Sequence, residues 1–69
     1  MKELRNEIMD YLLTIPKMNK QLVIAILNPL KTEKQLEKMK EHLANNYQDK
    51  ELMRRDKLLN LSLQISKEN

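Results

Sequence analysis

Apolar residues recur along this chain in four stretches that are separated by polar or proline-containing breaks. In the first stretch most of them are three or four positions apart, which places them on one face of a helix. They are Leu4, Ile8, Tyr11, Leu12 and Ile15. We therefore predict a first helix over about residues 3–14. Pro16 follows it and ends it, because the proline ring lacks an amide hydrogen and disfavours helical geometry at Ile15.

The second stretch, residues 22–27, is apolar at every position, so its periodicity fits a buried helix and a buried strand equally well. Helix is favoured because Asn19 can cap its start and Asn28-Pro29 can stop it. A helix that is apolar on all faces must be surrounded. We therefore expect it at the centre of the monomer or at the seam of an oligomer.

The third stretch opens with a capping box, in which the Thr32 hydroxyl accepts from the Gln35 amide and the Gln35 side chain reaches back. Apolar residues follow at three- and four-residue steps: Leu36, Met39, Leu43 and Tyr47. Asn45-Asn46 can adopt left-handed geometry and so end this helix in a chain that contains no glycine.

The last stretch predicts a helix that Asp49 caps and that runs to about residue 66, with a favourable pair between Glu51 and Arg55. Its apolar residues form two faces about 100° apart. One face holds Leu52, Leu59 and Leu63, and the other holds Leu58, Leu61 and Ile65. This apolar surface is broader than one packing contact requires.

Residues 59–66 also alternate between apolar and polar, as a half-buried strand does. Such a strand needs a partner, and only residues 22–27 offer one. The predicted fold is therefore an all-α single domain over residues 1–69, a small bundle of three or four helices. The alternative is an α+β fold with residues 22–27 and 59–65 as strands.

Composition removes most catalytic chemistry from consideration. The chain has no glycine and no cysteine, so phosphate-binding glycine loops, disulfides and thiol chemistry are absent. Its one histidine, His42, sits near the end of the third helix, where it favours the helix dipole and has no orienting acid nearby. Glu33, Glu37 and Glu41 alternate with lysines and indicate a solvated face rather than a metal site. We predict no enzyme activity, no catalytic residues, no cofactor, no metal and no small-molecule substrate.

The 13 basic and 10 acidic residues give a net charge of +3, and no segment is a basic tail. The densest basic group is Lys50, Arg54, Arg55 and Lys57. Acidic residues are interleaved with this group, which favours pairing within the helix over phosphate binding.

Residues 21–43, about a third of the chain, resemble the DNA-binding helix-turn-helix family in their order of helix, connection and capped helix. Ala25 suits the small inward position of the first helix. Pro29 stands where that family usually has its turn glycine, and Gln35 and Lys38 stand where its second helix buries apolar residues. The resemblance implies the alternative function, a small DNA-binding transcriptional regulator.

The longest apolar run is six residues, far below the roughly 20 that cross a bilayer, and charges occupy the place of a signal-peptide core. We therefore expect a cytoplasmic protein that does not enter a membrane. A 69-residue domain buries only roughly 60% of its unfolded surface, which favours self-association. The predicted function is a protein interaction or regulatory module, in the simplest case a homodimer. Its predicted partner-binding residues are Met53, Leu58, Leu61 and Ile65.

Overall fold

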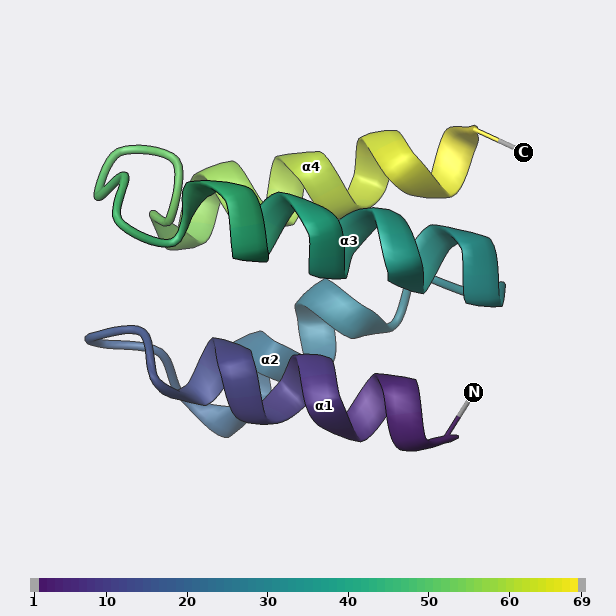
Figure 1. Ribbon diagram of the computed structural model, residues 1–69, viewed down its shortest axis with the longest axis horizontal. Coiled ribbons are helices and arrows are strands. Elements are labelled where there is room, and N and C mark those ends of the chain that lie inside the picture. The colour runs from purple at the N-terminus through teal and green to yellow at the C-terminus, as the bar shows by residue number, and fades with distance from the viewer. Residues whose placement is uncertain (1, 69) are drawn as a thin grey trace.

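The computed structural model describes residues 2–68, and within this range the chain forms four helices and no strand. The helices are α1 (Lys2–Leu13), α2 (Lys20–Leu27), α3 (Glu33–Asn46) and α4 (Arg55–Lys67) (Figure 1). The prediction of a small all-α bundle is confirmed. The α+β alternative is wrong, because residues 22–27 and 59–65 both lie in helices.

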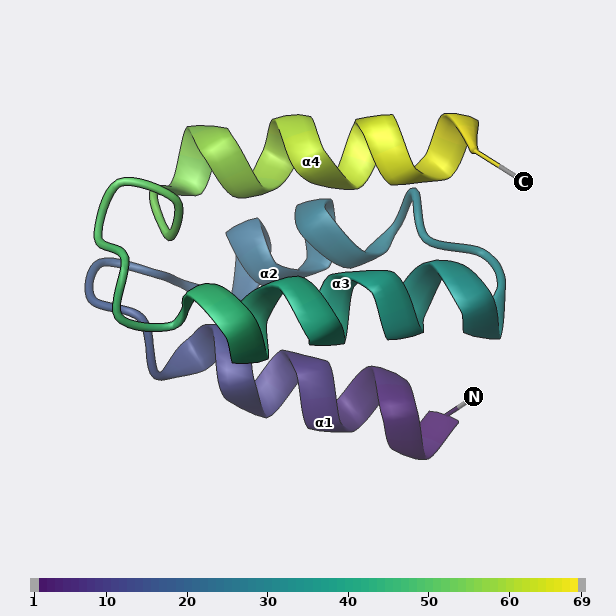
Figure 2. The ribbon, with the colours of Figure 1, turned by 45° about the horizontal axis from the view of Figure 1, so that its top comes forward.

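Successive helices run in opposite directions, so that α1 and α3 point one way and α2 and α4 the other (Figures 1 and 2). Helix α1 packs against α2 and α3, and α4 packs against the same two helices. Consequently α2 and α3, although consecutive in the chain, lie diagonally across the bundle. The α1–α2 and α3–α4 connections share one end of the bundle, which we call the loop end, and the α2–α3 connection lies at the other (Figure 2).

A single apolar core joins all four helices and the connections between them. Its buried members are Ile8, Leu12, Val23, Ile26, Leu27, Leu30, Leu36, Met39, Leu43, Met53, Leu58 and Ile65. Helix α2 does not lie at the centre of the monomer, so the first of the two predicted positions is wrong, while the seam of an oligomer stays a prediction. It packs mainly against α1 and α4, and Ala25 is exposed and the Ile24 side chain is 44% exposed.

Local polar signals place the starts of α2 and α3 as predicted. Asn19 Oδ1 accepts from the Leu22 amide at 2.9 Å. At α3 the Thr32 hydroxyl accepts from the Gln35 amide at 3.1 Å, and Gln35 Oε1 accepts from the Thr32 amide at 3.1 Å. The capping box is therefore confirmed, since both of its bonds are present.

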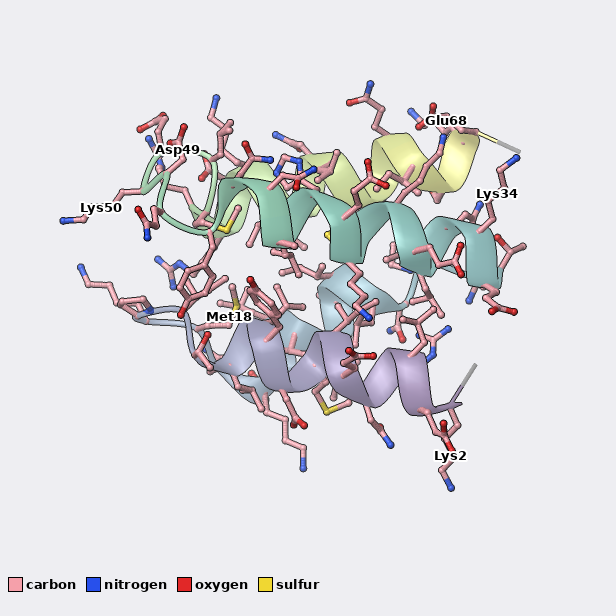
Figure 3. All side chains as sticks on the ribbon, in the orientation of Figure 1. Lys2, Met18, Lys34, Asp49, Lys50 and Glu68 are labelled. Atoms are coloured by element: carbon pink, nitrogen blue, oxygen red, sulfur yellow. The ribbon has the colours of Figure 1, made fainter. Side chains whose placement is uncertain are left out.

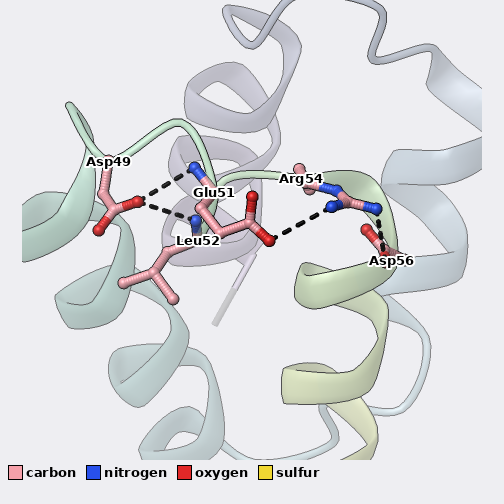
Figure 4. Close-up of polar contacts among 5 residues, drawn as sticks. All are labelled: Asp49, Glu51, Leu52, Arg54 and Asp56. Carbon is pink, nitrogen blue, oxygen red and sulfur yellow. Dashed lines mark hydrogen bonds and ion pairs between the residues drawn. The ribbon is translucent and has the colours of Figure 1, made fainter.

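Helix α4 begins five residues later than predicted, since its cap is Arg54 and not Asp49. Asp49 does cap a turn, because its carboxylate accepts from the amides of Glu51 and Leu52 at 3.0 and 3.1 Å (Figure 4). The turn does not continue as a helix, since Arg54 has extended backbone (φ −66°, ψ 149°) and α4 starts after it. This detour allows the side chain of Met53 to reach the core, where it is 6% exposed.

The predicted Glu51–Arg55 pair is replaced by a pair one residue earlier. The Arg54 guanidinium lies 3.2 Å from the Glu51 carboxylate and 3.2 Å from that of Asp56 (Figure 4). The extended backbone of Arg54 places its side chain between these two acidic residues. Arg54 thus pairs with neighbouring acidic residues, but not within a helix, because α4 begins after it. No ion pair of residues 2–68 involves Lys50, Arg55 or Lys57, so the predicted pairing within the helix is wrong for them.

The residue with left-handed backbone is not one of those that the sequence predicts. Asn45 and Asn46 both lie within α3, and Tyr47 ends the helix in right-handed geometry. Within residues 2–68 positive φ occurs at Lys17 (φ 67°), directly after Pro16. Left-handed backbone costs a residue with a Cβ about 1–2 kcal/mol, so the surrounding turn holds Lys17 against a local preference.

Side chains tie the helices together at their ends. Arg5 on α1 donates to the carbonyls of Leu27 and Leu30 at 3.1 and 2.7 Å, and so satisfies the carboxyl end of α2. The Ser62 hydroxyl on α4 donates to the Ile26 carbonyl on α2. These bonds fix α2, the shortest helix, against its two neighbours.

Candidate functional site

A large cleft opens at the loop end of the bundle, with a volume of about 1140 Å³. Its walls are the α1–α2 connection, the segment between α3 and α4, and the first turns of α2 and α4. The lining residues are Thr14, Ile15, Pro16, Lys17, Leu22, Tyr47, Gln48, Lys50, Met53, Arg54, Arg55, Asp56 and Leu59. The cleft is therefore built from segments that are up to 45 residues apart in the chain, from Thr14 to Leu59.

The floor of the cleft is apolar. Leu22 and Leu59 come from the first turns of two helices that start side by side at this end, and both are partly buried. Tyr47 forms part of the wall and is 47% exposed. Its ring packs edge-on against Tyr11, with ring centres 5.2 Å apart, which holds the wall to α1.

The charge of the whole molecule is concentrated at this cleft. Four basic residues and one acidic residue line it, which gives +3. The complete chain has 13 basic and 10 acidic residues, so the nine basic and nine acidic residues outside the cleft balance. One end of the bundle thus carries the net charge, and the rest of the molecule is neutral overall.

Most of the cations around the cleft are not neutralised by the protein. Arg54 is held between Glu51 and Asp56, but none of the ion pairs within residues 2–68 involves Lys17, Lys50 or Arg55. Lys50 extends away from the bundle at the loop end (Figure 3). Helices α2 and α4 also begin here, so the positive ends of their dipoles add to the potential. We call Lys17, Lys50 and Arg55 the rim cations.

The predicted partner-binding residues are mostly buried in the monomer. Leu58, Ile65 and Met53 are 0%, 3% and 6% exposed, so the prediction that they form an exposed face is wrong. Helix α4 packs against both α2 and α3, and the residues that it buries are Leu58, Ser62 and Ile65. Leu61 is partly buried, and the exposed apolar residue of α4 is Leu63, at 50%.

A second, smaller groove of about 370 Å³ runs between α3 and α4. Its lining includes Leu61 and Ile65 from α4 and His42 from α3. The Asn46 side-chain amide donates to the His42 carbonyl at 2.9 Å and lies 3.4 Å from its ring. Among the hydrogen bonds of residues 2–68 the His42 ring has no carboxylate or hydroxyl partner, so no acid–base pair is assembled around it.

Two further observations concern the described part of the chain. It contains no group of three or more His, Cys, Asp or Glu side chains placed to hold a metal ion. It also contains no helix with the length and apolar character needed to span a bilayer.

Comparison with protein-family models, curated proteins and solved structures gave no match to this chain.

The sequence did contain one signal for the cleft, the basic group at residues 50–57. Acidic residues are interleaved with this group, so the sequence predicts that its cations pair with them. The structure pairs Arg54 and leaves Lys50 and Arg55 without ion pairs among the described residues. Lys17 and Leu22, which come from the opposite wall, carried no local signal for a site.

Proposed function

We propose that this protein is a non-enzymatic interaction module that binds another protein chain in the cleft at the loop end. The observation that carries the proposal is an open cleft in which apolar side chains, among them Leu22 and Leu59, lie beside polar and charged ones. Apolar surface combined with polar and charged groups is the usual composition of a protein interface. The cytoplasmic location predicted from the sequence belongs to the same proposal.

The cleft spans two connections and two helix starts, so a ligand that fills it contacts segments that are far apart in the chain. A surface built in this way suits several side chains presented by another chain.

Two observations favour a protein partner over the alternative, a DNA-binding regulator. The cations of the cleft lie beside apolar side chains such as Leu22 and Leu59, which phosphate contacts do not use. The two helices compared with a helix-turn-helix, α2 and α3, lie diagonally in the bundle, and each packs against α1 and α4 instead. Duplex DNA that binds with strongly salt-dependent affinity would favour the alternative.

The proposal is tested with a matched pair of variants on α4. Leu59→Glu places a charge on the cleft floor, and Leu63→Glu places the same charge one turn further on, at an exposed residue outside the cleft. Peptides are selected from a displayed random library on the wild-type protein. We expect Leu59→Glu to weaken their binding at least about tenfold and Leu63→Glu to leave it unchanged. Circular dichroism confirms that both variants fold.

Mapping on the wild-type protein gives a second measurement that needs no variant. Addition of a selected peptide should shift the amide NMR signals of residues 14, 15, 17, 22 and 47–59. If no peptide is selected, or if the selected peptides bind Leu59→Glu as tightly as Leu63→Glu and shift other residues, the cleft is not an interaction site.

Self-association stays a prediction. Of the four predicted partner-binding residues, Leu61 is the one that is only partly buried. Light scattering at micromolar concentration checks it. A dimer that Leu61→Asp dissociates without unfolding the chain would support self-association through α4. A wild-type protein that stays monomeric would contradict it, and binding of a different chain in the cleft would be unaffected.

A further inference from the structure

The rim cations restrict what can cover the cleft. Lys17, Lys50 and Arg55 stand around an apolar floor, and none has an ion-pair partner within residues 2–68. A ligand in the cleft comes to lie beside these cations, where negative groups are attracted and positive groups are repelled. The ligand is therefore expected to bring negative charge as well as apolar side chains.

A second copy of this chain, docked cleft to cleft, does not meet this requirement. A two-fold dimer places the same surface patch on both subunits. Two clefts facing each other would bring a charge of +3 against +3, and like charges across an interface are repulsive. The charge distribution favours a different, acidic chain as the partner.

The secondary structure also restricts how that chain is held. Addition of a strand needs an exposed sheet edge, and residues 2–68 contain no strand. Proline-rich segments need a groove lined by aromatic rings, and the chain has two tyrosines and no phenylalanine or tryptophan. A helix laid in a groove requires neither feature, since it inserts apolar residues spaced three and four positions apart.

We propose, on the basis of the function proposed above, that the cleft binds an acidic amphipathic helix of another protein. Its apolar residues pack on Leu22, Met53 and Leu59, and its carboxylates pair with the rim cations. Binding is then expected to weaken as salt is raised, because the rim pairs are exposed to solvent.

The probe is a synthetic peptide of about 16 residues, long enough to form a helix, with leucines at i, i+3, i+4 and i+7 and glutamates beside them. Its counterpart keeps the leucines and replaces each glutamate with lysine. We expect the acidic peptide to bind at least about tenfold more tightly than the basic one, as measured by fluorescence anisotropy. Its NMR footprint should include the amides of Leu22, Met53 and Leu59.

A charge-reversal pair on α4 supplies the control. Arg55→Glu and Lys57→Glu change the net charge equally and both residues are exposed, but Arg55 lines the cleft and Lys57 does not. Both substitutions put an acidic residue in the first turn of a helix, which is favourable to folding. We expect Arg55→Glu to weaken the acidic peptide about tenfold and to strengthen the basic one, with little effect from Lys57→Glu.

Three results would overturn the inference. They are the absence of acidic-peptide binding, equal or tighter binding of the basic peptide, and equal effects of the two charge reversals. These results are distinct from failure of the proposed function, which is decided by the library-selected peptides. A different result is that the selected peptides are neutral or basic and still bind Leu59→Glu less tightly than the wild type. In that case the protein is an interaction module, and it has no preference for acidic helices.

Discussion

Leu58→Asp is expected to abolish cooperative folding of this domain. The Leu58 side chain is 0% exposed and packs in the core between α4 and its neighbours. The substitution removes a buried leucine, which costs about 2–5 kcal/mol, and adds a carboxyl group with no partner, which costs several more. A chain of 69 residues has a total stability of about 3–10 kcal/mol, so the loss matches or exceeds what is available.

Leu63→Asp is the matched control for this prediction, since it introduces the same group on the same helix at a residue that is 50% exposed. We expect it to change the free energy of unfolding by no more than about 0.5 kcal/mol. Urea unfolding followed by circular dichroism measures both. A Leu58→Asp protein that still unfolds cooperatively near the wild-type midpoint would contradict the position of α4 in the bundle.

The parts of the fold that the sequence predicted depend on neighbouring residues. The Thr32–Gln35 capping box and the Asn19 cap involve bonds across three residues, so their patterns are visible without the tertiary structure. The inward face of α3, with Leu36, Met39 and Leu43, follows from helical spacing in the same way.

The parts that were missed depend on contacts between distant segments. The pattern of α4 alone does not say which of its apolar residues face the core. The structure buries Leu58 and leaves Leu63 50% exposed, because α4 packs against α2 and α3, and only the tertiary arrangement reveals this. Likewise, no residue type near Arg54 signals the late start of α4, and the burial of Met53 beside it is visible only in the structure.

The cleft illustrates the same limit for the candidate site. The sequence shows the basic residues at 50–55, but not that they share a cleft with Lys17 and Leu22, which the topology brings to the loop end. Sequence patterns reported the composition of one wall. They do not show that Leu22 and Lys17 form the other wall.

Gln35→Leu is expected to lower the free energy of unfolding by about 2–4 kcal/mol. The Gln35 side chain is 9% exposed, and its amide oxygen accepts from the backbone amides of Lys31 and Thr32 at 2.7 and 3.1 Å. Its amide nitrogen donates to the carbonyls of Ser66 and Glu68 at 3.4 and 3.2 Å. One side chain thus joins the start of α3 to the end of α4.

Leucine has a similar volume but can form none of these bonds, so it leaves two backbone donors and two backbone acceptors without this partner. Each lost hydrogen bond costs about 0.5–1.5 kcal/mol, and partial access of water at the helix ends limits the sum. Gln64→Leu is the control, because Gln64 is exposed on α4 and its side chain makes no hydrogen bond within residues 2–68. Urea unfolding of the two variants should differ by at least about 1.5 kcal/mol. Equal stabilities would show that this bridge between α3 and α4 contributes nothing, and that apolar packing and the Lys38–Glu68 ion pair hold the two helices together.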